Sequence, residues 1–178
     1  RLVGSEMCIR DSYNIDGREI VTLREELTQT ENYMGIQKIR FPERFFVEIL
    51  VEEELMECRV LKFILQPIVE NSYKYGFAEK KKKNILRIHS YRDESNIIIV
   101  IEDNGAGIDE NKVKKINEAL AGERGFETAA GIGIRNVNAR IKNYYGEDCG
   151  VRLESEPGNF TRVYLKIREL PFGEKGEI

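Results

Sequence analysis

The chain has 178 residues, a length that suits one domain of ordinary size with a short extra segment. Charged residues make up 33% of it and hydrophobic residues 41%, and no apolar run reaches the roughly eighteen residues of a membrane span, so we expect no membrane contact by this fragment. The net charge of -3 argues against a partner among the nucleic acids, because domains that bind phosphate backbones carry a strong positive excess.

The N-terminal region divides into two parts. Residues 1–12 share no periodic pattern with the residues after them and resemble translated adapter or vector sequence, with a native linker as the alternative. Thr22 and Glu25 form a Ser/Thr-x-x-Glu capping box, and the apolar spacing behind them predicts a helix to about Arg40. Pro42 ends that helix.

A second helix, predicted over residues 61–76, carries the most informative pattern. At about 100° per residue, the side chains of Glu70, Asn71 and Lys74 fall in one sector of this helix. The opposite sector holds an apolar stripe made of Ile64, Leu65, Ile68, Val69 and Ser72. The helix therefore has one polar face available for chemistry and one face for the core.

Five segments are rich enough in β-branched and aromatic residues to predict strands: residues 45–51, 85–91, 97–102, 151–155 and 160–167. Short polar segments join the second strand to the third and the fourth to the fifth, which predicts two hairpins. The apolar run in the third strand is continuous, as in a central strand that is covered on both faces. The acidic residues 52–54 after the first strand predict a solvated turn.

Glycine-rich segments punctuate the second half of the chain. Residues 103–107 break the central strand, after which Asp109 can cap the next helix. Residues 121–132 hold several glycines and few large apolar side chains, so we expect a mobile lid there. Helical spacing resumes over residues 133–145 and stops at Gly146.

Three separated motifs occur in the order seen in one nucleotide-binding superfamily. Residues 65–76 (LQPIVENSYKYG) resemble the N box, and residues 103–108 (DNGAGI) the G1 box, of the GHKL ATPases. Residues 131–137 (GIGIRNV) with 140–146 (RIKNYYG) resemble the G2 box and adjoining helix of the histidine kinases related to the YesM and LytS sensors. The likeness runs from about residue 20 to 168.

The resemblance implies the Bergerat fold. In this α+β architecture, a two-layer α/β sandwich, a mixed sheet carries helices on one face and ATP lies between the helices and a lid. It also implies three regions after the first twelve residues. These are a linker helix from the histidine kinase region (13–42), the ATP-binding domain (43–170) and a C-terminal tail (171–178).

Asp103 is the strongest single candidate for binding the base. A buried carboxylate at the end of a strand can accept a hydrogen bond from the 6-amino group of adenine, where guanine carries an oxo acceptor. Gly105 and Gly107 allow close approach of a base to the turn, or serve the turn alone. By resemblance, Thr161 touches the adenine side from the last strand.

Other candidates concern the phosphates and a metal. The amide oxygen of Asn71 suits Mg²⁺, which bridges phosphates and keeps several waters. Lys74 either meets a phosphate as a point charge or pairs with Glu70 one turn away. By resemblance, Glu70 is the catalytic base or orienter toward an incoming histidine. Phosphate oxygens can be held by free N–H groups at the start of a helix, here those of Gly131, Ile132 and Gly133.

The function implied by the resemblance is that of the catalytic ATP-binding domain of a two-component sensor histidine kinase. With ATP and Mg²⁺ as cofactors, such a domain donates the γ-phosphate to a histidine on the phosphoacceptor and dimerisation domain of the parent kinase, which serves a response regulator downstream. His89, the only histidine here, lies in an alternating strand and is interpreted as structural. Two alternatives stay open: a GHKL ATPase that works as an ATP-driven clamp, and an anti-sigma-type serine kinase.

The cysteines bear on the compartment. Cys8, Cys58 and Cys149 form no CxxC pair and no Cys/His cluster, which is typical of free thiols in a reducing compartment. Together with the resemblance, this predicts a cytoplasmic domain of a membrane-anchored bacterial sensor kinase.

Overall fold

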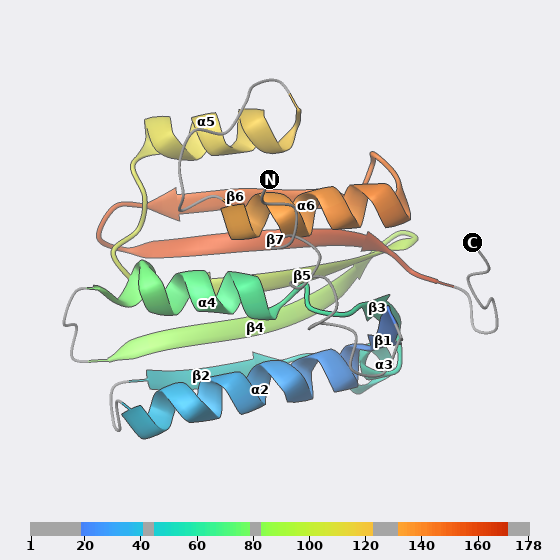
Figure 1. Cartoon of the computed structure of the whole chain (residues 1–178), viewed down its shortest axis with the longest axis horizontal. Coiled ribbons are helices and arrows are strands. Elements are labelled where there is room, and N and C mark those ends of the chain that lie inside the picture. Colours follow the sequence, from blue (N-terminus) through green and yellow to red (C-terminus); the bar gives the residue numbers. More distant parts are fainter. Residues whose placement is uncertain (1–18, 41–44, 79–82, 123–131, 171–178) are drawn as a thin grey trace, which may run out of the picture.

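A mixed five-stranded sheet forms one layer of the structure, and helices pack on one of its faces to form the second layer (Figure 1). The structure is a computed structural model that describes residues 19–40, 45–78, 83–122 and 132–170. The hydrophobic core lies between the two layers and draws on both strands and helices. This arrangement confirms the predicted α+β sandwich with a mixed sheet and helices on one face.

All five predicted strands belong to the main sheet. They are β2 (Phe45–Leu50), β4 (Asn84–Asp93), β5 (Asn96–Asp103), β6 (Gly150–Glu156) and β7 (Phe160–Arg168). Their order across the sheet is β2, β4, β5, β7, β6. β2 runs parallel to β4, whereas all other neighbours are antiparallel, so that the two predicted hairpins are the β4–β5 and β6–β7 pairs.

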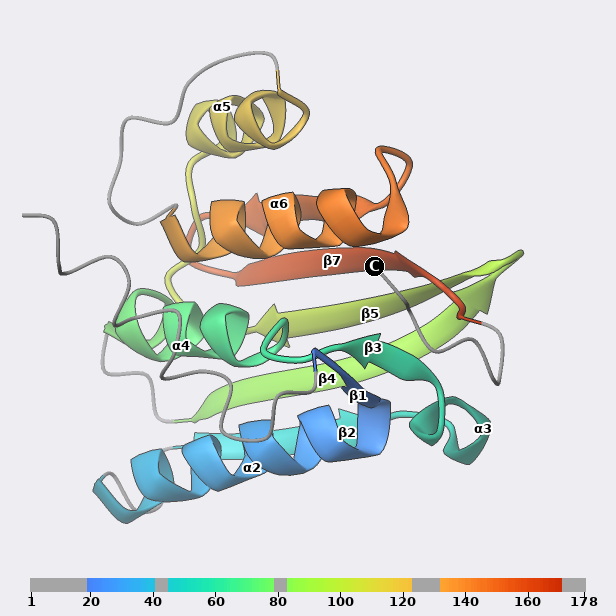
Figure 2. The ribbon, with the colours of Figure 1, turned by 45° about the vertical axis from the view of Figure 1, so that its right-hand side comes forward.

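Both faces of the central strand β5 are buried, as its continuous apolar run predicts. Ile97, Ile99 and Ile101 face the helices and belong to the core. Ile98 and Val100 alternate with them along the strand, so they point to the opposite, open face, the one without helices in Figure 2, and they are only 7% and 0% exposed. Side chains of the neighbouring strands must therefore cover this second face.

A row of alternating charges crosses the open face, one residue from each strand in sheet order: Glu48, Arg87, Glu102, Arg162 and Glu154. Each member stands directly opposite the next in the strand register. The N–O distances are 2.8 Å from Arg87 to Glu48 and 3.2 Å from Arg87 to Glu102, and Arg162 forms ion pairs with Glu102 and Glu154. Opposite charges at paired positions stabilise a sheet by roughly 0.2–1 kcal/mol each, and the long side chains cover the apolar strand beneath them.

The N-terminal helix α2 (Leu23–Arg40) begins at the predicted capping box. The backbone N–H of Thr22 donates to Glu25 Oε2 at 2.8 Å, and the N–H of Glu25 donates to Thr22 Oγ1 at 3.1 Å. Leu23, Leu27 and Met34 of this helix are buried in the same core as the sheet. Within the described ranges, neither α2 nor any other helix is long and apolar enough to cross a membrane.

A small second sheet was not predicted. It pairs β1 (Ile20–Thr22) with β3 (Arg59–Leu61) in antiparallel register. The predicted acidic turn is also wrong in form, because its residues enter a short helix, α3 (Glu53–Met56), although their side chains are exposed as expected. Three-residue strands and one-turn helices are too short to show a hydrophobic period, so they leave no pattern to find.

The polar-faced helix begins later than predicted, at Gln66 instead of residue 61, and forms α4 (Gln66–Lys74). Three features of the structure delay it. Residues up to Leu61 pair with β1, the backbone of Phe63 adopts a left-handed φ of 60°, and Pro67 is suited to the first turn of a helix. The one-turn 3₁₀ helix η1 (Gly76–Ala78) comes directly after α4.

Two helices cover the far end of the sheet: α5 (Glu110–Leu120), which Asp109 caps as predicted, and α6 (Ile132–Tyr145), which ends at Gly146 with a φ of 102°. Two side-chain amides tie them to the edge strand β6. Asn117 Nδ2 donates to the carbonyl of Leu153 at 2.8 Å, and Asn117 Oδ1 accepts from the N–H of Leu153 at 2.9 Å. Asn138 of α6 accepts from the N–H of Val151 and donates to the carbonyl of Leu120. Of the predicted lid, residues 123–131 lie outside the described ranges.

Replacing Asn117 with alanine should lower the free energy of unfolding by about 1–3 kcal/mol, because it leaves a partly buried N–H and C=O of β6 without their partner. Urea denaturation followed by circular dichroism measures this. The matched control is Asn111→Ala, whose side chain is exposed on the same helix. Equal stability of the two variants would contradict the role of Asn117 as a substitute for a neighbouring strand.

Candidate functional site

A pocket of about 400 Å³ is lined by residues of α4, α5 and α6 and of the strands β5, β6 and β7. This volume lies in the range of small-molecule sites. Four of the predicted site residues line it: Asn71 from α4, Asp103 from the end of β5, Gly107 from the loop after β5 and Thr161 from β7. The structure thus brings together the N box and G1 box residues that lie far apart in the sequence.

Asp103 is a buried carboxylate at the floor of this pocket, only 3% exposed. Ser72 Oγ donates to Asp103 Oδ2 at 2.7 Å, and the N–H of Gly105 donates to Oδ1 at 2.9 Å. Thr161 stands directly opposite Asp103 in the β5–β7 register, so both side chains reach the pocket from adjacent strands. A carboxylate has about four acceptor sites, so Asp103 can accept from a ligand while it keeps these two bonds.

The glycines of the G1 turn are required by the protein's own backbone. A Cβ at Gly105 would overlap the carbonyl of Gly76, and a Cβ at Gly107, whose φ is 67°, would overlap the carbonyl of Glu156. The N–H of Ala106 in turn donates to the Gly76 carbonyl at 2.8 Å. Of the two interpretations that the sequence leaves open, packing of the turn accounts for both glycines.

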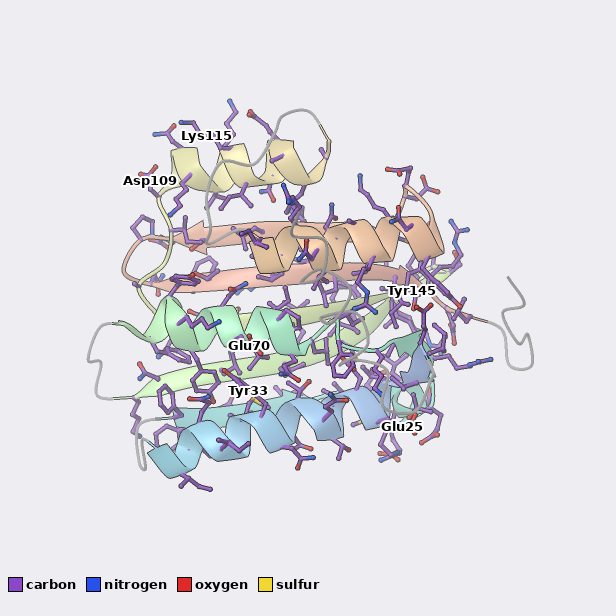
Figure 3. All side chains as sticks on the ribbon, in the orientation of Figure 1. Glu25, Tyr33, Glu70, Asp109, Lys115 and Tyr145 are labelled. Atoms are coloured by element: carbon purple, nitrogen blue, oxygen red, sulfur yellow. The ribbon has the colours of Figure 1, made fainter. Side chains whose placement is uncertain are left out.

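The three predicted site residues of α4 occupy different places. Asn71 lines the pocket, and its Nδ2 atom is buried with no hydrogen-bond partner among the described residues. Glu70, labelled on α4 in Figure 3, accepts from Gln66 Nε2 at 3.0 Å. Lys74 is 62% exposed and its Nζ lies 3.7 Å from Glu70, which makes it the helical partner of Glu70 in this structure. Neither Glu70 nor Lys74 lines the pocket.

The G2 box stands close to Asn71. A Cβ built on Gly133 would lie 3.6 Å from Asn71 Nδ2, so the first turn of α6 approaches the amide with only a glycine between them. Ile132 begins α6 and is 50% exposed. Gly131 lies outside the described residues. The start of a helix and an unpartnered amide therefore meet at one side of the pocket.

Two residues that contact Asp103 were not among the predicted site residues. Ser72 was assigned to the apolar stripe of α4, where it is buried, but its hydroxyl serves Asp103. A Cβ at Gly76 would approach Asp103 Oδ1 to 2.7 Å, so only glycine leaves room for this carboxylate. A lone serine within an apolar stripe, next to a candidate ligand, was the available signal for Ser72.

The chain is similar in sequence to one family of ATPases and to individual sensor proteins. Residues 58–171 match the family described as histidine kinase-, DNA gyrase B- and HSP90-like ATPase. The chain is 30% identical to the sensor protein LytS of Staphylococcus haemolyticus over 76% of its own length and 23% of that protein. It is 33% identical to the sensor histidine kinase YesM of Bacillus subtilis over 84% of its own length and 24% of that protein. It thus spans about a quarter of the length of these relatives.

A solved structure supports the same assignment at the level of the fold. The crystal structure of the histidine kinase ThkA in complex with the response regulator protein TrrA aligns with a TM-score of 0.61 at 14% identity, over 95% of this chain and 48% of that one. The family match covers well over half of the residues. This chain therefore belongs to the histidine kinase-, DNA gyrase B- and HSP90-like ATPases.

Proposed function

We propose that this chain is the catalytic ATP-binding domain of a sensor histidine kinase, which binds Mg-ATP and donates its γ-phosphate to a histidine on the phosphoacceptor and dimerisation domain of the parent kinase. The observation that carries the proposal is the buried Asp103 carboxylate on the floor of a pocket of ligand size. The relatives named as sensors, and the ThkA complex with a response regulator, support a place in two-component signalling.

Asp103 selects the base. Its carboxylate accepts from the 6-amino group of adenine, and an acceptor at that point rejects the 6-oxo group of guanine. Ser72 and Gly105 hold the carboxylate by one hydrogen bond on each oxygen, so it needs no rearrangement to receive the base. Thr161 adds a hydroxyl from the neighbouring strand, and Ser155 Oγ lies 3.1 Å from that hydroxyl.

Asn71 stands at the phosphate side of the pocket. Asn71 supplies one hard amide oxygen, the kind of ligand that Mg²⁺ takes, while its unpartnered Nδ2 is a donor that can reach a phosphate oxygen beside the start of α6, which favours anions. When bound, the ion would neutralise charge on the β- and γ-phosphates. Gly131, Ile132 and Gly133 would hold phosphate oxygens through backbone N–H groups, and Asn71 would hold the metal.

Glu70 is the residue that we propose acts on the incoming histidine. It lies next to Asn71 on α4 but outside the pocket lining, where a partner domain can approach it. Gln66 and Lys74 contact its two carboxylate oxygens, which fixes the side chain for orienting the imidazole or accepting its proton. In this proposal Lys74 holds Glu70 in place, and its binding to a phosphate requires that this ion pair opens.

The same proposal extends to the parent protein. The match covers only 23% and 24% of these relatives, so the phosphoacceptor domain and any membrane anchor belong to other parts of such a protein. We place residues 13–42 in the linker from the histidine kinase region, 43–170 in the ATP-binding domain and 171–178 in a tail. The domain would act on the cytoplasmic side of the membrane.

Asp103→Asn should weaken ATP binding about ten- to a hundredfold, because it replaces an acceptor by a donor in front of the adenine amine, a loss of roughly 1.5–3 kcal/mol. The substitution keeps the shape of the side chain and the Gly105 hydrogen bond. Titration with a fluorescent adenine nucleotide, competed with ATP and GTP, measures the change. Asp93→Asn, at the far end of β4, is the matched control. The assignment of the base site is wrong if the Asp103 variant binds ATP as tightly as the control does and prefers ATP over GTP to the same degree.

Asn71→Ala should make nucleotide affinity nearly indifferent to magnesium while leaving the fold intact. Calorimetric titration of ATP with and without Mg²⁺ gives the ratio of the two affinities, which should fall toward one. Asn143→Ala, exposed on α6, serves as control and should keep the wild-type ratio. An unchanged ratio in the Asn71 variant contradicts its role as a metal ligand.

The isolated chain should not phosphorylate itself. His89 alternates with Ile88 and Ser90, which are buried on the helix side, so its imidazole lies on the open face with the sheet between it and the pocket. In-line transfer requires a nucleophile next to the γ-phosphate, which His89 cannot become. Incubation with labelled ATP and assay of acid-labile phosphate checks this, with a separate phosphoacceptor domain as the positive control. A stoichiometric phosphohistidine at position 89 is the contradicting result.

A further inference from the structure

The segment that leads into α4 is held from two sides by helices that lie apart in the sequence. Residues 62–65 connect β3 to α4 and pass between α2 and α6 (Figure 2). Glu26 of α2 and Arg140 of α6 both reach their backbone. Because α4 carries Asn71 and Ser72, the position of this segment determines where these two side chains line the pocket.

Glu26 makes the larger number of contacts. Its carboxylate accepts three backbone hydrogen bonds: from Phe63 to Oε2 at 2.8 Å, and from Ile64 and Leu65 to Oε1 at 2.8 and 3.0 Å. Glu26 is 1% exposed. Leu65 is the N-cap residue of α4, so these hydrogen bonds hold the N-cap residue and the two residues before it, not the first N–H groups of the helix itself.

Arg140 holds the same segment by its carbonyls. Its guanidinium donates to the carbonyl oxygens of Lys62 at 2.8 Å and of Phe63 at 3.2 Å. At the end of α6, Tyr145, labelled in Figure 3, accepts from the N–H of Leu61 at 3.1 Å. The N–H groups of Phe63, Ile64 and Leu65 thus bind to α2, and the carbonyls of Lys62 and Phe63 bind to α6.

The conformation of the segment requires such support. Phe63 adopts a left-handed φ of 60°, which is strained for a bulky side chain and persists only where the surroundings determine it. The three N–H bonds to Glu26 and the two carbonyl bonds to Arg140 provide that determination. Burial raises the pKa of the Glu26 carboxyl, while the backbone N–H groups of Leu65, Phe63 and Ile64 act in the opposite direction because they stabilise the charged form.

We infer that Glu26 is a positioning residue for nucleotide binding, which sets the start of α4 and thereby the distance between Asn71 and the base site at Asp103. This role rests on the proposed function, since it acts through Asn71. Through this role α2 supports the nucleotide site indirectly, although no residue of α2 lines the pocket.

The test uses Glu26→Gln in the full chain. The glutamine amide keeps the size of the side chain. Its NH2 group, however, takes the place of a carboxylate oxygen and cannot accept from a backbone N–H, so at least one of the three hydrogen bonds is lost. ATP is titrated with and without Mg²⁺. The ratio of the affinity with Mg²⁺ to the affinity without it should fall about tenfold, which corresponds to about 1.4 kcal/mol. The reason is that Asn71, which Glu26 positions, is the proposed metal ligand.

Two further variants complete the experiment. Glu25→Gln, one residue away on the same helix and exposed, should keep the wild-type ratio. Arg140→Gln loosens the same segment from α6 and should reproduce the loss, which keeps the test decisive if Glu26→Gln does not fold. A purely structural role for Glu26 would lower the melting temperature and leave the magnesium ratio of the folded fraction unchanged.

The outcomes separate the two levels of the proposal. If the wild-type chain does not bind ATP, the proposed function fails and the role of Glu26 fails with it. If the wild-type chain binds ATP with a clear dependence on magnesium and both Glu26→Gln and Arg140→Gln retain that dependence, the proposed function stands and the positioning role is overturned.

Discussion

The buried carboxylate of Asp103 is the constraint on which the rest of the site depends. A carboxyl group at 3% exposure is tolerated only where hydrogen-bond partners surround it, and the structure meets this demand from a helix, through Ser72, and from a turn, through Gly105. Gly76 must be small to leave room for the carboxylate, and Gly105 must be small to let the turn reach it. The end of β5, the end of α4 and the G1 turn are therefore fixed relative to one another before any ligand arrives.

The second requirement of such a site is that its helices stay attached to the sheet. α5 and α6 solve this at the edge strand β6, whose outer backbone groups would otherwise lack partners. Asn117 offers Leu153 the same donor and acceptor that a neighbouring strand would offer, and Asn138 accepts from Val151 while also joining the end of α5 to α6. The chain thus protects a sheet edge and anchors both helices that flank the G2 region with the same two amides.

Much of this could be predicted from the residue pattern, for identifiable reasons. All five strands of the main sheet and the capped starts of α2 and α5 depend on local periodicity and local hydrogen bonds, which the sequence displays. The start of α4 was predicted too early, at residue 61 instead of Gln66, because the hydrogen bonds that replace helix there come from Glu26, which is distant in the sequence. Ser72 was assigned to the core for the same reason: its partner Asp103 is distant in sequence and adjacent only in the fold.

The charge row on the open face has a consequence for how the strands find their alignment. Glu102 stands between Arg87 and Arg162, so a two-residue slip of β5 along its neighbours would break the contacts of both arginines with Glu102 at once and leave each arginine with a carboxylate on one side only. The apolar side chains of β5 are isoleucine and valine at every position from 97 to 101, so they distinguish poorly between the native alignment and a slipped one. The five charges, one per strand, therefore favour the native register of β5 over a slipped register that its apolar side chains alone would hardly distinguish.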